Sequence, residues 1–134
     1  YDKALDYFKW VMQQSESASD FEKKVILKPL ALAASKIAEN IAEGSARHKP
    51  QFIQFLKDAK SEIRTCVVIS TLAFKNGVFD NEQYEQSHET LVEMTKMVGA
   101  MIVSLQKNGE RNQNSRSQIL DTDFNTDDSM SFEY

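Results

Sequence analysis

The side chains in this chain that are best suited to chemistry are cations that could hold phosphate groups. Six of them share one stretch, three consecutive and three at helical spacing: Arg47, His48, Lys49, Lys57, Lys60 and Arg64. The last three fall on one face of a predicted helix, and the first three lie at its N-terminal end, where free N–H groups and the helix dipole attract phosphate. This pattern predicts a salt-sensitive contact with RNA or DNA that does not depend on base sequence. The alternative is an ordinary solvated helix face, because Asp58 and Glu62 are interleaved as intrahelical partners.

Four glutamates form an acidic stripe on another predicted helix, at spacings of three, four and four residues: Glu82, Glu85, Glu89 and Glu93. No histidine or aspartate joins them at ligand spacing, so we expect no metal site here. A solvated face is the simplest interpretation. The alternative is a contact with the basic face of a neighbouring subunit, which suits a cyclic, head-to-tail ring.

The sequence contains no arrangement of residues that is typical of an enzyme. It has no phosphate-binding loop and no zinc signature, and its two histidines belong to no Ser-His-Asp pattern, so we expect a non-enzymatic protein without a cofactor. Cys66 lies in an apolar run, which indicates an inert core thiol. As the only cysteine it excludes an internal disulfide and fits a reducing, cytoplasmic compartment. No apolar run approaches the roughly 20 residues that span a bilayer, so we expect no membrane partner.

Charge is distributed unevenly along the chain. Residues 109–134 carry six acidic and two basic side chains, which accounts for the whole net charge of −4. The remaining residues are neutral overall, although the stretch 23–64 is basic and the stretch 80–93 is acidic. A neutral body with opposite patches can steer charged partners or self-associate.

The spacing of apolar residues predicts four helices that would position these charges, over about 2–14, 19–44, 49–76 and 80–108. Their connections have only a few residues, so neighbouring helices must run antiparallel. No apolar–polar alternation persists, and β structure therefore has little support. The predicted fold is all-α, an antiparallel up-down-up-down four-helix bundle over residues 1–108.

Local signals mark where these helices start and where one is disturbed. Ser19 with Glu22 predicts a capping box at the start of the second helix, and Asp80 with Gln83 predicts a cap for the fourth. Pro29 lies inside the second pattern. Because proline removes one backbone hydrogen bond, it should kink the helix or separate its first turn.

Three residues near the link between the second and third helices have predicted structural roles. Gly44 fits the left-handed position past a helix C-terminus. Asn40 is expected to be a buried polar residue that fixes helix register. Glu43 is expected to accept hydrogen bonds from the link.

The stretch 66–74 is apolar nearly all round, which is typical of a helix that is covered on more than one side. In a domain of this size we expect another subunit or a partner to supply the second cover. The candidate contact residues are Val68, Ile69 and Leu72.

The stretch 109–134 is rich in Asn, Ser, Gln and Asp, which predicts an acidic polar tail that is disordered unless it is bound. Scattered apolar side chains could still dock it on a partner. The candidate tail anchors are Phe124, Phe132 and Tyr134.

Several short motifs occur in order along the chain: Ala33-Ala34-Ser35-Lys36-Ile37, Asn40-Ile41-Ala42-Glu43-Gly44-Ser45, Arg47, Phe52-Ile53, Phe55-Leu56 and Ser61-Glu62-Ile63-Arg64-Thr65. With them the chain resembles, over roughly residues 20–107, the "four helix bundle protein" family. The founding members of that family are encoded in intervening sequences of bacterial 23S ribosomal RNA genes. The resemblance implies an antiparallel bundle, usually a homopentamer, with no known catalytic activity.

A related branch of that family is the accessory protein of diversity-generating retroelements, a basic pentamer that binds a reverse transcriptase and its template RNA. This chain departs from the family pattern at three positions. The family commonly has proline where Ala38 stands, a serine or threonine cap in place of His48, and an acidic residue in place of Arg64.

Together these features predict a homo-oligomeric scaffold that associates with RNA or a ribonucleoprotein, and the family resemblance implies five subunits. The alternative is a protein-interaction module or an accessory subunit. In that case the acidic, aromatic tail would bind a protein partner such as a reverse transcriptase.

Overall fold

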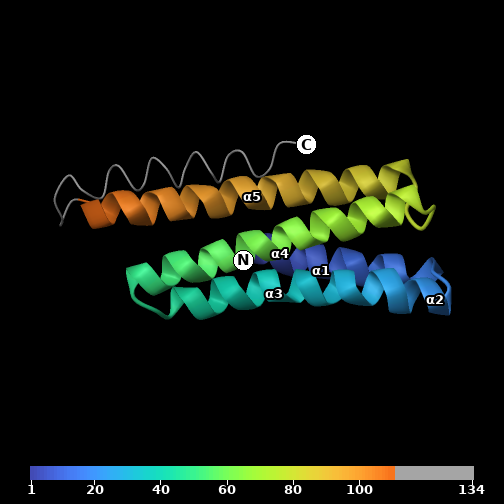
Figure 1. Cartoon of the computed structure of the whole chain (residues 1–134), viewed down its shortest axis with the longest axis horizontal. Coiled ribbons are helices and arrows are strands. Elements are labelled where there is room, and N and C mark those ends of the chain that lie inside the picture. Colours follow the sequence, from blue (N-terminus) through green and yellow to red (C-terminus); the bar gives the residue numbers. More distant parts are fainter. Residues whose placement is uncertain (111–134) are drawn as a thin grey trace.

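The computed structural model describes residues 1–110, and the regular structure within them is helical throughout. The elements in chain order are α1 (Asp2–Gln14), η1 (Ser15–Ser17), α2 (Asp20–Glu22), η2 (Lys23–Leu27), α3 (Lys28–Ser45), α4 (Lys49–Lys75) and α5 (Asn81–Glu110). The segments α2, η2 and α3 follow one another without a break and act as one helix (Figure 1). The residues designated above as a tail lie outside the described part of the chain, apart from the first two, which still belong to α5.

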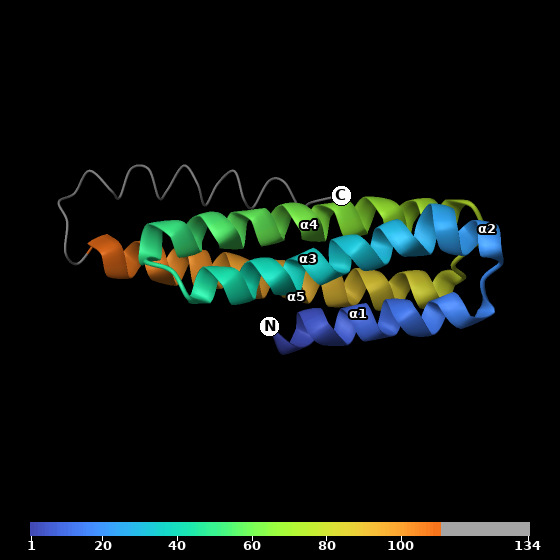
Figure 2. The ribbon, with the colours of Figure 1, turned by 90° about the horizontal axis from the view of Figure 1, so that it is seen from below.

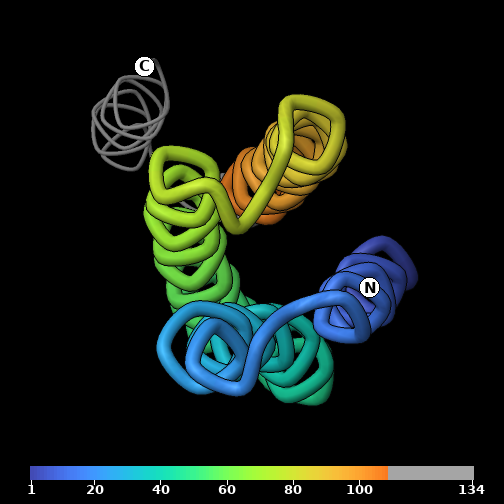
Figure 3. The backbone as a smooth tube through the Cα atoms, turned by 90° about the vertical axis from the view of Figure 1, so that its right-hand side faces the viewer, coloured from blue at the N-terminus to red at the C-terminus, as the bar shows by residue number. Residues whose placement is uncertain are grey.

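The four long helical units surround a common interior, as the end-on view in Figure 3 shows. Helix α3 packs along α4, α4 packs along α5, and α1 lies against α3 and α5. Successive helices run in opposite directions, which confirms the predicted all-α, up-down-up-down bundle (Figures 1 and 2). Helix α1 is much shorter than α4 and α5, so it covers only the half of the bundle near α2 (Figure 2).

Both predicted helix caps are present. The Oγ of Ser19 accepts a hydrogen bond from the Glu22 N–H at 3.1 Å, and the Glu22 carboxylate accepts from the Ser19 N–H at 3.0 Å. At α5, the Asp80 carboxylate accepts from the Gln83 N–H at 2.8 Å and the Gln83 side chain accepts from the Asp80 N–H at 2.9 Å. These bonds satisfy donors that a helix start otherwise leaves without partners.

Pro29 disturbs its helix by widening the turn before it. Segment η2 is a π-helix, and the Lys28 N–H bonds the carbonyl of Lys23, five residues back. A proline offers no N–H to the carbonyl four residues earlier and its ring crowds that group, so a wider turn relieves both problems. The interruption expected from the sequence therefore appears as a π segment, not as a separate helix.

The interior is largely apolar, and its buried polar side chains among the described residues are Lys60, Ser70, Ser87, Thr95 and Gln106. Ser70 and Ser87 belong to a chain of buried hydroxyl groups. The Tyr7 hydroxyl lies 2.8 Å from Ser87 Oγ, and Ser70 Oγ donates to Ser87 Oγ at 2.8 Å. Burial raises the pKa of Tyr7 above its usual value, so this phenol stays neutral. The bonds join α1, α4 and α5 at one level and give the interior a fixed register.

Candidate nucleic-acid and partner-binding surfaces

Gly44 determines how closely α3 approaches α4. A Cβ atom at this position would lie 2.7 Å from Phe55 Cβ and 2.9 Å from Phe52 Cδ1. Gly44 lies within α3, and within the described residues the glycine with a positive φ is Gly77, at 76° in the turn before α5. The left-handed role predicted for Gly44 is therefore wrong. A side chain has no room at this position because Phe52 and Phe55 of α4 pack directly against it.

The other two residues of this motif have local partners. The Asn40 side-chain amide donates to the carbonyl of Lys36 in its own helix at 2.9 Å, and the residue is only partly buried. The predicted role of Asn40 as a buried register residue is wrong, because the residue is only partly buried and its amide bonds a carbonyl of its own helix. The Glu43 carboxylate accepts a hydrogen bond from Arg47 and forms an ion pair with it. Glu43 thus contacts the α3–α4 link, in the way the sequence suggested.

The α3–α4 link presents a compact group of exposed cations. Arg47, His48 and Lys49 are all exposed. The guanidinium of Arg47 is held between Glu43 and the ring of Phe55, whose centroid lies 5.6 Å away. His48 is the N-cap of α4 with extended backbone, and its side chain makes no capping hydrogen bond. The first turn of α4 therefore lacks a side-chain cap beside three basic residues.

The basic face predicted on α4 is only partly at the surface. Lys57 and Arg64 are partly buried, whereas Lys60 has only 3% of its surface exposed. Lys60 points toward α5, with Nζ at 3.9 Å from the Cβ position of Gly99. Neither interpretation of the sequence, phosphate binding or a solvated face, anticipated a buried lysine. The physical reason is that α5 packs against this face and Gly99 leaves room for the lysine side chain.

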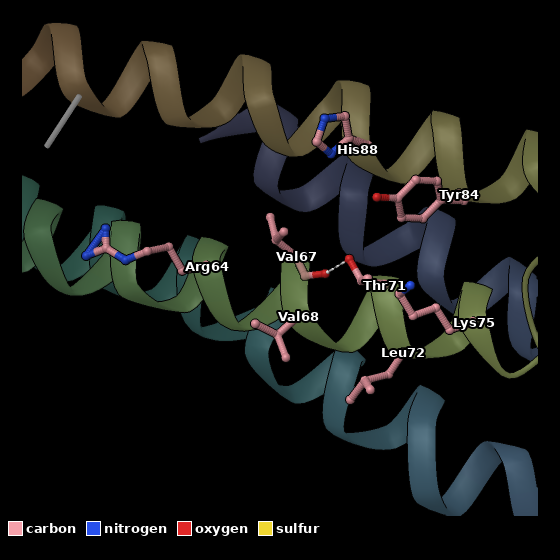
Figure 4. Close-up of a pocket in the computed structure, with 8 residues that line it drawn as sticks. All are labelled: Arg64, Val67, Val68, Thr71, Leu72, Lys75, Tyr84 and His88. Atoms are coloured by element: carbon pink, nitrogen blue, oxygen red, sulfur yellow. Dashed lines mark hydrogen bonds between the residues drawn. The ribbon is translucent and has the colours of Figure 1, made fainter. Parts of the chain in front are cut away.

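A groove runs between α4 and α5 beside this basic face (Figure 4). Its cavity volume is about 410 Å³, and we call it the α4–α5 groove. Most of its surface is apolar, with cations at both ends, and its lining residues are Arg64, Val67, Val68, Thr71, Leu72, Lys75, Tyr84 and His88. The rings of Tyr84 and His88 stack with centroids 5.9 Å apart, and Tyr84 also stacks on Phe74.

Val68 and Leu72 were predicted from the sequence as contact residues, but the groove itself was not predicted. Val68 is 58% exposed and Leu72 46% exposed, whereas Ile69 packs partly buried against the core. The helical spacing of Arg64, Val68, Thr71 and Lys75 on α4 was a usable signal. What the sequence could not supply was the facing pair Tyr84 and His88, because which side of α5 faces α4 is a tertiary property.

The acidic stripe on α5 lies at the surface. All four glutamates, Glu82, Glu85, Glu89 and Glu93, are exposed. Glu93 forms an ion pair with Lys3 of α1, and the hydrogen bond and charge of that carboxylate raise the pKa of Lys3. One end of the stripe is thus paired within the chain. Among the described residues no group of three or more His, Cys, Asp or Glu side chains could hold a metal ion.

Cys66 is fully buried, and burial raises its pKa to about 12. The thiol therefore has neither the access nor the thiolate character that a reactive cysteine needs. The predicted tail anchors Phe124, Phe132 and Tyr134 lie outside the described residues. Within residues 1–110, the helices are too short or too polar to cross a membrane.

Comparison with known proteins gives one informative result. The family model described as "23S rRNA-intervening sequence protein" matches residues 1–100. A search of curated proteins finds no match.

Proposed function

Because this chain belongs to the family of 23S rRNA-intervening sequence proteins, we propose that it is a non-enzymatic, homo-oligomeric scaffold that binds RNA. The observation that carries the RNA part is the exposed basic group Arg47, His48 and Lys49 at the start of α4. The ring of five subunits implied by the family resemblance carries over to the proposal. Each subunit would present the same basic surface.

The geometry of the link suits phosphate. Glu43 and Phe55 hold Arg47 in place while the side chain stays 44% exposed, and Lys49 extends from the first turn of α4. The helix start adds uncapped backbone N–H groups and the positive end of the helix dipole. Neutralisation of phosphates by such groups releases counterions, so binding of this type weakens steeply as salt rises.

Self-association has support from a row of exposed apolar side chains on the outer side of the α2–α3 helix. Phe21 is 74% exposed, Val25 48% and Leu32 53%. Exposed apolar side chains that gather on one helix often mark a contact with another protein. We propose that a neighbouring subunit covers this row, and that the acidic stripe of α5 lies toward the basic side of the next subunit in the ring.

The test is retention of single-stranded RNA by the full-length protein across a salt series. We expect affinity to fall steeply with salt, and the double variant Arg47→Glu/Lys49→Glu to lose most of the binding. The slope of log K against log salt should decrease by roughly 0.7 for each lost contact. The matched control is Lys9→Glu/Lys24→Glu, which makes the same charge change at exposed lysines on α1 and η2.

Equal losses in both double variants would show that only net charge matters and would contradict a site at the link. A chain that binds no RNA at low salt would contradict the RNA part altogether. Capture of a protein partner that is lost on deletion of residues 111–134, with RNA retention unchanged, would instead favour the interaction-module alternative.

A further inference from the structure

The α4–α5 groove combines apolar side chains with cations. Val67, Val68 and Leu72 make an apolar floor, and Val68 and Leu72 are about half exposed in the described structure. Arg64 and Lys75 stand at its two ends, and none of the described lining residues carries a carboxylate. A ligand for this groove should therefore combine apolar side chains with negative charge.

The last 24 residues of the chain, 111–134, have that combination. Five acidic side chains occur among them: Asp121, Asp123, Asp127, Asp128 and Glu133. Large apolar side chains are interleaved with these: Ile119, Leu120, Phe124, Met130, Phe132 and Tyr134. Charge and apolar content thus both complement the groove, and the segment is joined to the same chain at the end of α5.

The lengths also agree. From Glu110 back to His88, α5 rises about 33 Å. The 24 residues 111–134 can span at most roughly 79 Å when fully extended, at about 3.3 Å per residue, so they are long enough to turn after α5 and reach the apolar part of the groove.

Along such a path the acidic residues of the segment would reach the basic side chains, and its aromatic residues would reach the apolar part of the groove. Lys60 lies level with Gly99, so Lys57 and Arg64 lie about one turn to either side of that level. A segment that returns from the end of α5 reaches this basic part first, and its aspartates, between 121 and 128, precede Phe132 and Tyr134 in the sequence. The aspartates would therefore come beside Lys57 and Arg64, and Phe132 and Tyr134 further along, beside Val68 and His88.

We propose that residues 119–134 fold back along α5 and dock in the α4–α5 groove of their own chain, with the aspartates beside Lys57 and Arg64 and with Phe132 and Tyr134 against Val68 and Leu72. The sequence alone suggested a second subunit or partner over Val68 and Leu72. The tail takes that place, which leaves the Phe21, Val25 and Leu32 row for contacts between subunits.

Docking has a regulatory consequence, and this part rests on the proposed RNA function. The aspartates occupy the side of α4 that continues the basic surface beyond the α3–α4 link. RNA that extends from Lys49 toward Arg64 must displace them. The tail then acts as an intramolecular competitor of RNA. It weakens RNA binding and favours RNA that makes long or highly charged contacts with the protein.

The docking test measures how fast a thiol reagent labels a cysteine placed in the groove, Val68→Cys, in the full-length protein without RNA. Cys66 is buried with a raised pKa and contributes little background. We expect slow labelling, and about tenfold faster labelling when Phe132→Ala/Tyr134→Ala or Asp127→Lys/Asp128→Lys is added, because anchor residues dominate such contacts. The control cysteine, Ser104→Cys, is exposed on α5 outside the groove lining and should label at one rate in all backgrounds.

Equal rates at Val68→Cys with and without the tail substitutions would overturn the proposal. Protection that disappears on dilution, in step with dissociation of the oligomer, would also overturn it, because a neighbouring subunit would then be the cover. Since no RNA is present, failure of the proposed RNA function would leave this result unaffected. Tighter RNA binding by Asp127→Lys/Asp128→Lys than by Asp6→Lys/Glu16→Lys, which adds equal charge at exposed positions on α1 and η1, would support the competition.

Discussion

At the scale of single residues, Gly44 shows how one missing side chain fixes the spacing of two helices. Phe52 and Phe55 pack directly over the position where its Cβ would be. The same close approach places Phe55 beside the Arg47 guanidinium, which Glu43 holds from the other side. Close packing at Gly44 therefore helps to position the cation that we propose as part of the RNA contact.

Gly44→Ala should destabilise the bundle by about 1–3 kcal/mol, because the new methyl group overpacks the contact and Phe55 Cβ, next to its backbone, cannot swing aside. The measurement is chemical unfolding followed by circular dichroism. Gly99→Ala is the matched control, since among residues 1–110 its Cβ would come near only Lys60 Nζ, at 3.9 Å. It gains up to about 1 kcal/mol of helix propensity and should be neutral or stabilising. Equal unfolding free energies for the two variants would contradict the packing argument.

At the scale of elements, the helix from Asp20 to Ser45 begins with a capping box, and the segment that follows lacks regular α-helical hydrogen bonds. The capping box at Ser19 satisfies two donors in the first turn, just before η2 replaces the usual hydrogen-bond ladder with π geometry. The wider turn accommodates Pro29, but it leaves the start of this helix dependent on its cap. The exposed Phe21 and Val25 belong to this same segment.

Ser19→Ala should cost about 1 kcal/mol of unfolding free energy, because the Glu22 N–H loses its acceptor. Amide hydrogen exchange should also speed up first in residues 20–27. Ser17→Ala is a suitable comparison, since the Ser17 hydroxyl makes only a long 3.5 Å bond to the carbonyl of Gln14. A Ser19→Ala variant with unchanged exchange in that segment would show that packing, not the cap, holds it.

At the scale of the whole molecule, the described surface separates basic, acidic and apolar side chains by face. Basic side chains gather at the α3–α4 link, the acidic stripe lies on α5, and the apolar row of Phe21, Val25 and Leu32 lies on the α2–α3 helix. A scaffold built from copies of this bundle could bury the apolar row between subunits and still present the link to RNA.

Leu32→Lys should lower the mass measured by multi-angle light scattering toward that of the monomer, because a buried charge disfavours the subunit contact. Leu5→Lys is the matched control: Leu5 is 45% exposed on α1 and Leu32 is 53% exposed on α3. Both variants should keep the helical content of the parent chain. If Leu32→Lys keeps the parent mass, the apolar row is not the interface.

Much of the fold was predictable because its signals are local. Apolar spacing gave the four helices, and Ser19 with Glu22 and Asp80 with Gln83 marked two starts that the structure confirms. Capping depends on residues three positions apart, so the sequence contains all of its information. The role of Gly44 and the burial of Lys60 were not predictable in this way, because each depends on a residue of another helix.

The sequence by itself determined the helices, their antiparallel order, the family, and the stretches where charge and apolar side chains concentrate. The tertiary structure decided which of those side chains meet. It placed Lys60 against Gly99, opened a groove that joins Arg64 and Lys75 of α4 to Tyr84 and His88 of α5, and left Arg47, His48 and Lys49 exposed together. The physical reason is that helical periodicity fixes the direction of each side chain around its own axis, whereas the rotation of one helix against its neighbours depends on packing across the whole interior.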